Sequence, residues 1–217
     1  MSSLPNLSAT APDLPRASRL QKPYVLALVA GLWLVCVTVG LGVLWAHSHV
    51  AGELDEPPLA WPSDSALPHY SDRPTLVFFA HPQCPCTLAS LRELDRLLAD
   101  VSMPLKTVIV FVKPEGATGK WTDGLVWSAA EGIRGTELFV DEGCREAQRF
   151  AAKTSGQICL YDGNGRLMYH GGITSARGYE GDNTGRSAVH ALLTGGKAQQ
   201  SCPVYGCSLN TPETQPQ

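Results

Sequence analysis

Two cysteines separated by a single proline, Cys84-Pro85-Cys86, are the residues of this sequence best suited to chemistry. They follow a short apolar run, Thr75 to Ala80, and precede a segment in which leucines recur at spacings of three and four. This pattern places them between a buried strand and the first turn of an amphipathic helix. Free N–H groups and the helix dipole stabilise a thiolate there, giving a pKa of roughly 3.5 to 7.5. We therefore expect thiol–disulfide exchange, with Cys84 as nucleophile and Cys86 as partner or resolving thiol.

The spacing of the two cysteines limits how they can pair. Residues two apart on a helix point to nearly opposite sides, whereas a disulfide needs Cβ atoms about 3.5 to 4.5 Å apart. A bond between Cys84 and Cys86 therefore requires Cys84 to lie outside the helix. Alternatively, either cysteine pairs with Cys202 or Cys207 near the C-terminus. These last two could equally close a small structural loop with each other.

Two other interpretations of the cysteines stay open. Two soft thiolates together with His81 or His170 would suit Cu(I), the one cofactor that the sequence suggests. In the third interpretation the cysteines are purely structural and the chain is a tethered binding domain. Cys144 and Cys159 lie within apolar patterns, and we expect both to be small buried side chains without reactivity.

An apolar segment near the N-terminus predicts a membrane anchor. No charged residue occurs from Tyr24 to Ala46, and a helix needs roughly 20 residues to cross the hydrocarbon core. The segment is longer than the apolar core of a cleaved signal peptide. Positive charge precedes it at Arg16, Arg19 and Lys22, and the next Lys or Arg is Arg73. The positive-inside rule then predicts one pass through a bacterial cytoplasmic membrane, a cytoplasmic N-terminus and a periplasmic or otherwise extracytoplasmic domain, where disulfides persist.

Length and charge restrict the remaining possibilities. A chain of 217 residues has room for one ordinary domain with appendages, and its net charge of −3 leaves no basic face for nucleic acid. We expect five segments: a cytoplasmic tail (1–23), the membrane anchor (24–46), a proline-rich linker that serves as an extended spacer (47–73), a folded domain (74–196) and a cysteine-containing C-terminal tail (197–217).

The folded segment alternates between strand and helix patterns. Short apolar runs predict strands at 75–80, 108–112, 137–141, 158–161 and 166–170, the last two joined as a hairpin through Asp162-Gly163-Asn164-Gly165. Apolar residues at helical spacing predict helices at 88–98, 125–131, 142–153 and 186–193. Asp182 and Asn183 stand where they could cap the last helix. This element order predicts an α/β fold.

The stretch from Phe78 to Thr87 resembles the thioredoxin superfamily, in which a strand ending in aromatic-aromatic-Ala leads into a Cys-x-x-Cys helix start. Aligned on Ala80, Cys86 matches the family's second cysteine and Gln83 occupies the place of the first. Gly156 holds the position of the family's cis-proline. The resemblance spans about Pro74 to Gly195 and implies a thioredoxin-like sandwich, a central mixed sheet with helices on both faces.

A narrower resemblance concerns the motif His81-Pro82-Gln83-Cys84-Pro85-Cys86 in combination with Gly171–Thr174 and Gly181–Asn183. This combination is similar to the RedB-type proteins within the membrane-tethered redoxin branch. The resemblance implies a thiol–disulfide oxidoreductase whose partners are protein disulfides or dithiols and whose catalytic residues are Cys84 and Cys86.

Overall fold

The computed structural model describes residues 23–115, 117, 121 and 124–209. The chain divides into two units, residues 1–43 and 44–217, and each is described by itself. The predicted cytoplasmic tail, apart from its last residue, and the final eight residues lie outside the described part, as do the charges at Arg16, Arg19 and Lys22.

Helix α1, Pro23–Ser48, contains the predicted anchor. Its 26 residues correspond to about 39 Å of helix, against about 30 Å for the hydrocarbon core of a bilayer. None of its residues is buried, and its apolar side chains surround the helix without a polar stripe. By length and composition α1 can therefore span a membrane.

A six-stranded mixed sheet forms the centre of the second unit, in the order β3-β2-β1-β4-β5-β6. Strands β1, β2 and β3 are parallel, β4 is antiparallel to β1, and β5 is antiparallel to β4. The short β6 pairs in parallel with β5. The strands are β1 Thr75–Ala80, β2 Lys106–Lys113, β3 Thr136–Glu142, β4 Ile158–Tyr161, β5 Leu167–Gly171 and β6 Ser201–Cys202.

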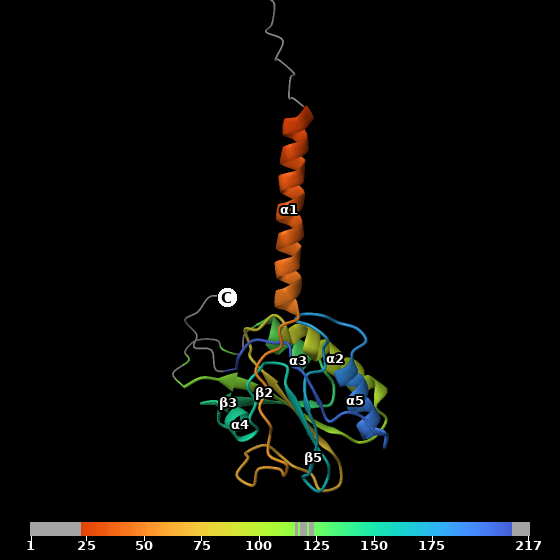
Figure 1. The fold of residues 1–217 in the computed structure, drawn as a ribbon. Coiled ribbons are helices and arrows are strands. Elements are labelled where there is room, and N and C mark those ends of the chain that lie inside the picture. The colour runs from red at the N-terminus through yellow and green to blue at the C-terminus, as the bar shows by residue number, and fades with distance from the viewer. Residues whose placement is uncertain (1–22, 116, 118–120, 122–123, 210–217) are drawn as a thin grey trace, which may run out of the picture. The chain divides into compact units, whose positions relative to one another are not determined.

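Side chains alternate between two apolar layers along β1, as the two-residue period of a strand requires. Leu76 and Phe78 face the layer made by α2 (Thr87–Asp100), α3 (Leu125–Glu131) and α5 (Thr184–Leu193). Val77 and Phe79 face the opposite layer, which contains Phe150 and the residues around α4 (Arg145–Arg149). Figure 1 shows α2, α3 and α5 neighbouring one another, with α4 apart from them. The predicted sheet with helices on both faces is confirmed.

The predicted helix at 142–153 is wrong in length, because only Arg145–Arg149 is helical. The Asp141 carboxylate accepts the backbone N–H groups of Glu146 and Ala147, both at 2.9 Å, and so fixes where the helix begins. Cys144 has a left-handed backbone with φ of 54° and lies before the helix, although its side chain is buried as expected. The last predicted helix is confirmed, and Asn183 caps it by accepting from the Arg186 N–H at 2.7 Å.

Residues of the predicted spacer pack on the domain, as do described residues of the predicted tail up to Leu209. Leu67 is buried in the layer of Phe150, and Tyr161 donates from its hydroxyl to the Pro58 carbonyl at 2.9 Å. At the other end of the chain, Cys202 belongs to β6 and is buried. The segment at 51–73 thus differs from the extended spacer that its prolines suggest, because apolar residues between them reach the sheet.

Candidate active site

The cysteine motif lies at the carboxyl end of β1, as predicted. Cys84 is held in a turn by its N–H, which donates to the His81 carbonyl at 3.1 Å. Cys86 has φ of −64° and ψ of −25° and directly precedes Thr87, the first residue of α2. Cys84 therefore lies outside the helix, where free N–H groups and the positive end of the helix dipole favour a thiolate.

A third cysteine, Cys207 near the C-terminal end of the chain, contacts Cys84 of the motif. The Sγ atoms of Cys84 and Cys207 are 2.8 Å apart, although 123 positions separate the two residues. Cys84 is only 1% exposed, whereas Cys86 and Cys207 are half-buried. The Cys84 and Cys207 sulfurs are in contact without a disulfide bond between them.

Cys207 is held in place by backbone pairing between the segment Val204–Leu209 and the loop before β4. The Ser155 N–H donates to the Cys207 carbonyl and the Leu209 N–H donates to the Lys153 carbonyl, both at 2.8 Å. Gly206 lies so close to this loop that a Cβ atom there would be 1.9 Å from the Ser155 carbonyl oxygen. Only glycine fits this approach.

The surroundings of Cys84 favour its thiolate and lower its pKa to about 5. The largest cause is the hydrogen bond between the Cys84 and Cys207 sulfurs, in which Cys207 keeps the proton when Cys84 is ionised. Burial raises the pKa of Cys84, but the hydroxyl and N–H of Thr87 add further donors. The Thr87 hydroxyl also lies 2.6 Å from the Ser155 hydroxyl, which accepts the His81 N–H at 2.8 Å. Ser155 thus orients Thr87 toward the sulfur.

The pKa values of the two neighbouring thiols, Cys207 and Cys86, shift upward. The hydrogen bond to Cys84 holds the proton on Cys207 and raises its pKa. Burial and the adjacent Cys84 thiolate raise the pKa of Cys86. The positive charge of Arg177 opposes both increases, and its guanidinium also donates to the Gly206 carbonyl. One thiolate and two thiols therefore stand together near one guanidinium.

Three side chains of this site escape prediction from the sequence. In the sequence, nothing distinguishes Thr87 and Ser155 from other polar residues. Arg177 lies in a glycine-rich loop far along the chain from the cysteine motif. The adjacency of Thr87 to Cys86 is the one available signal, because a hydroxyl in the first turn of a helix can face the preceding loop. The roles of Ser155 and Arg177 depend on contacts between segments that are distant in sequence.

The two histidines predicted as possible metal ligands, His81 and His170, lie in different parts of the sheet region. The buried His81 accepts the Gln83 N–H at its Nδ1 atom, and burial lowers its pKa. His170 lies in β5, where burial lowers its pKa and the Glu56 carboxylate opposes this effect. Within the described residues, no group of three or more His, Cys, Asp or Glu side chains is arranged to hold a metal ion.

The remaining cysteines of the domain are placed elsewhere. Cys202 is buried in β6, where its sulfur accepts from the Gln199 amide, and it forms no disulfide. Burial raises the pKa of Cys144 and of Cys159. Both are buried thiols, as predicted for small packing residues.

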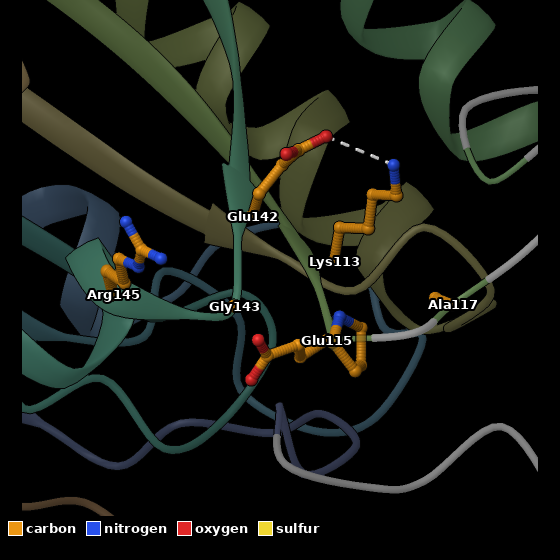
Figure 2. Close-up of a pocket in the computed structure, with 7 residues that line it drawn as sticks. Lys113, Glu115, Ala117, Glu142, Gly143 and Arg145 are labelled. Atoms are coloured by element: carbon orange, nitrogen blue, oxygen red, sulfur yellow. Dashed lines mark hydrogen bonds and ion pairs between the residues drawn. The ribbon is translucent and has the colours of Figure 1, made fainter.

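A charged hollow lies at the ends of β2 and β3, and Figure 2 shows the side chains that line it. Lys113 and Glu142 form an ion pair at 3.1 Å, while Glu115 and Arg145 also contribute to the lining. None of the cysteines belongs to this lining. The hollow is therefore separate from the thiol site, and its exposed ion pair is of the kind that adds little stability.

Comparison with solved structures supports the fold. No protein family and no curated protein matches the sequence. Among solved structures, a hypothetical protein from Sinorhizobium meliloti 1021 matches with 20% identity and a TM-score of 0.55, over 75% of this chain and 98% of that one. An uncharacterized conserved protein from Geobacillus kaustophilus matches with 21% identity and a TM-score of 0.53, over 77% and 95%.

A third match is a SCO1/SenC family lipoprotein from Bacillus anthracis str. Ames, with 13% identity and a TM-score of 0.43, over 65% of this chain and 98% of that one. The sheet order, the strand directions and the position of the cysteine motif together give a thioredoxin-like fold, preceded by a helix that can span a membrane. The predicted thioredoxin-like sandwich is confirmed as a fold.

Proposed function

We propose that this chain is a membrane-anchored thiol–disulfide oxidoreductase that exchanges electrons with protein disulfides or dithiols outside the cytoplasm. One observation carries the proposal: the thiol that precedes α2 has its sulfur 2.8 Å from the sulfur of a second thiol. Two thiols at this distance can exchange a proton and can be oxidised to a disulfide with little movement. The donors around Cys84 support the reaction because exchange requires a thiolate.

The chemistry is a two-electron cycle between a dithiol and a disulfide. In the reduced protein Cys84 is a thiolate and its partner is a thiol. In the oxidised protein their sulfurs are joined, and the two electrons have passed to the client disulfide. The low pKa of Cys84 stabilises the reduced form and so makes the disulfide more oxidising.

Turnover of a model client tests the proposal. The full chain, purified in detergent micelles, is assayed for insulin reduction with dithiothreitol and for reactivation of scrambled ribonuclease. We expect Cys84→Ser to lower both rates to those of the buffer. Cys36→Ser removes a thiol from α1 and is the matched control, with rates like those of the unchanged chain. A Cys84→Ser variant that works like the unchanged chain would contradict the proposal.

Copper binding is the alternative to be separated from this function. Two adjacent sulfurs would suit Cu(I), although no group of three or more His, Cys, Asp or Glu side chains among the described residues is arranged to hold a metal ion. An anaerobic titration of the reduced chain with Cu(I) distinguishes the two functions. Weak, non-stoichiometric binding supports the redox proposal. Tight one-to-one binding that disappears in Cys84→Ser, together with an inactive unchanged chain, would replace it with copper handling.

The extracytoplasmic location is part of the proposal and has its own test. The positive residues before α1, at Arg16, Arg19 and Lys22, support a cytoplasmic N-terminus. We expect proteinase added to intact spheroplasts to digest the domain that follows α1. Protection of the domain until the membrane is dissolved would place it in the cytoplasm instead, where a persistent disulfide is not expected.

A further inference from the structure

We infer that Cys207 is the disulfide partner of Cys84, so that the working disulfide joins the start of α2 to the C-terminal segment Val204–Leu209. The inference rests on the proposed function and names the second sulfur of the couple. It assigns no bond to Cys86, which the sequence suggests as the partner.

The short Cys84–Cys207 distance and the helical backbone of Cys86 favour Cys207 as the partner. A disulfide has an S–S distance of about 2.04 Å, so the sulfurs of Cys84 and Cys207 need to approach by only about 0.8 Å from their present 2.8 Å. Cys86 is separated from Cys84 by one residue and already has the backbone angles of a helix. A bond between these two would strain the first turn of α2. Cys86 interacts with both Cys84 and Arg177, in each case by a hydrogen bond and by charge, so it is the helical backbone of Cys86 that disfavours the bond.

The C-terminal segment is fixed by contacts that depend on its sequence. Its backbone pairs with Lys153 and Ser155, and the Val204 carbonyl accepts the Gly52 N–H at 2.8 Å. Gly206 allows the close approach to the Ser155 carbonyl, and Arg177 donates to Gly206. Cys207 is therefore held beside Cys84 by four separate attachments. A chance encounter of a loose tail with a thiol would show none of them.

The exposure of the two sulfurs indicates where a client reacts. Cys84 is 1% exposed and Cys207 is half-buried, so a client meets Cys207 first. A thiolate prefers to expel the sulfur with the lower pKa, and the pKa of Cys84 is about 5. Accessibility and leaving-group ability thus favour the same reaction, which is attack at Cys207 with departure of Cys84.

A client dithiol is oxidised by the Cys84–Cys207 disulfide in two exchange steps. A client thiolate attacks the Cys207 sulfur, a client–Cys207 disulfide forms, and the Cys84–Cys207 bond breaks with its electron pair on Cys84. The client's second thiolate then attacks the client sulfur of the mixed disulfide and expels the Cys207 thiolate. The client is oxidised by two electrons and the protein is reduced by two. One client proton goes to Cys207 and the other to solvent, and the reverse sequence reduces a client disulfide.

Disulfide mapping of the full chain in detergent micelles tests the inference. The chain is equilibrated in a buffer of reduced and oxidised glutathione, quenched with acid, alkylated, digested with trypsin and analysed by mass spectrometry. Cys36, Cys84 and Cys86 share one tryptic peptide, because proline follows both Lys22 and Arg73, and Cys202 and Cys207 share another, so single serine variants assign the bond. We expect a crosslink between these two peptides in the unchanged chain, in Cys86→Ser and in Cys202→Ser. Neither Cys84→Ser nor Cys207→Ser should form it.

Turnover distinguishes failure of the inference from failure of the proposed function. Cys207→Ser should lose at least about tenfold in client turnover, whereas Cys202→Ser, the matched control from the same segment, should stay within about twofold. A Cys84–Cys86 disulfide with undiminished turnover in Cys207→Ser would overturn the inference and leave the oxidoreductase intact. Undiminished turnover in Cys84→Ser would overturn the proposed function itself.

Discussion

Cys84 and Cys159 are both buried, with exposed fractions of 1% and 0%, yet their pKa values move in opposite directions. Burial alone raises the pKa of Cys159. Around Cys84 the donors Cys207 and Thr87 outweigh burial and lower the pKa to about 5. The comparison shows that depth does not decide whether a thiol is reactive. The supply of hydrogen-bond donors to its sulfur does.

The position of each cysteine in the fold explains the difference in donors. Cys159 lies inside β4, between β1 and β5, where the backbone N–H groups serve the sheet. Cys84 lies between a strand and a helix, where the first N–H groups of α2 have no intrahelical partner. The same residue type therefore acts as a packing group in one region and as an ionisable group in the other.

The largest expected effect is the titration of Cys84. In the reduced full chain, the ultraviolet absorbance of a thiolate should appear with a midpoint near pH 5, well below the ordinary value of 9. Cys84→Ser should remove this transition, and Cys159→Ala should leave it in place. If the first thiolate appeared only above pH 8, the pKa of Cys84 would not be lowered, which would contradict the difference between Cys84 and Cys159.

The lowered pKa of Cys84 should make the free energy of unfolding depend on pH. The pKa of Cys84 is lower in the folded than in the unfolded chain, so its contribution is complete above about pH 9 and is lost as the pH falls through 5. Relative to Cys84→Ser, the reduced chain should therefore gain up to about 1.4 kcal/mol of unfolding free energy per pH unit between these limits. The raised pKa of Cys207 should reverse the gain above about pH 9. Denaturant unfolding at several pH values measures this, and a flat difference would contradict it.

Removing one hydrogen-bond donor should raise the pKa of Cys84 and so make this thiol more like Cys159. Thr87→Val keeps the shape of the side chain but removes the hydroxyl that donates to the Cys84 sulfur. Hydrogen bonds to charged groups contribute about 1.5 to 3 kcal/mol, so the midpoint of the thiolate titration should rise by about one to two units. Thr107→Val removes another buried hydroxyl from β2 and serves as the control. Equal midpoints in the two variants would exclude Thr87 as a donor.

The smallest expected effect concerns Cys159. Cys159→Ser places a hydroxyl in the apolar layer around Phe150 and should lower the free energy of unfolding by about 1 to 3 kcal/mol. Client turnover at a temperature where the variant is folded should not change. Chemical denaturation and the insulin assay check both statements. A loss of turnover in the folded variant would mean that this buried thiol takes part in the reaction.

Sequence patterns predict those parts of the fold that local physics determines. The apolar run at β1 and the leucine spacing of α2 predict both elements, and together they place Cys84 before the helix. The helix predicted at 142–153 is too long because the Asp141 carboxylate and two left-handed residues, Cys144 and Ala151, interrupt the apolar pattern. Such effects depend on single side-chain contacts that periodicity does not contain.

The candidate site was predictable only in part. The Cys84 position follows from the strand and helix patterns, and the sequence raises Cys207 only as one of two equal candidates in the tail. The choice of Cys207 over Cys202 depends on Gly206 packing against Ser155, a contact between segments about 50 positions apart. Arg177 and Thr87 likewise acquire their roles through the folded arrangement.

A redox titration of the full chain is the most direct test of the central claim. The protein in detergent micelles is equilibrated over a series of glutathione redox buffers, and its free thiols are counted after alkylation. We predict one two-electron transition in which two thiols disappear together, and its absence in both Cys84→Ser and Cys207→Ser. An unchanged number of thiols across the series, or the same transition in Cys84→Ser, would contradict the account.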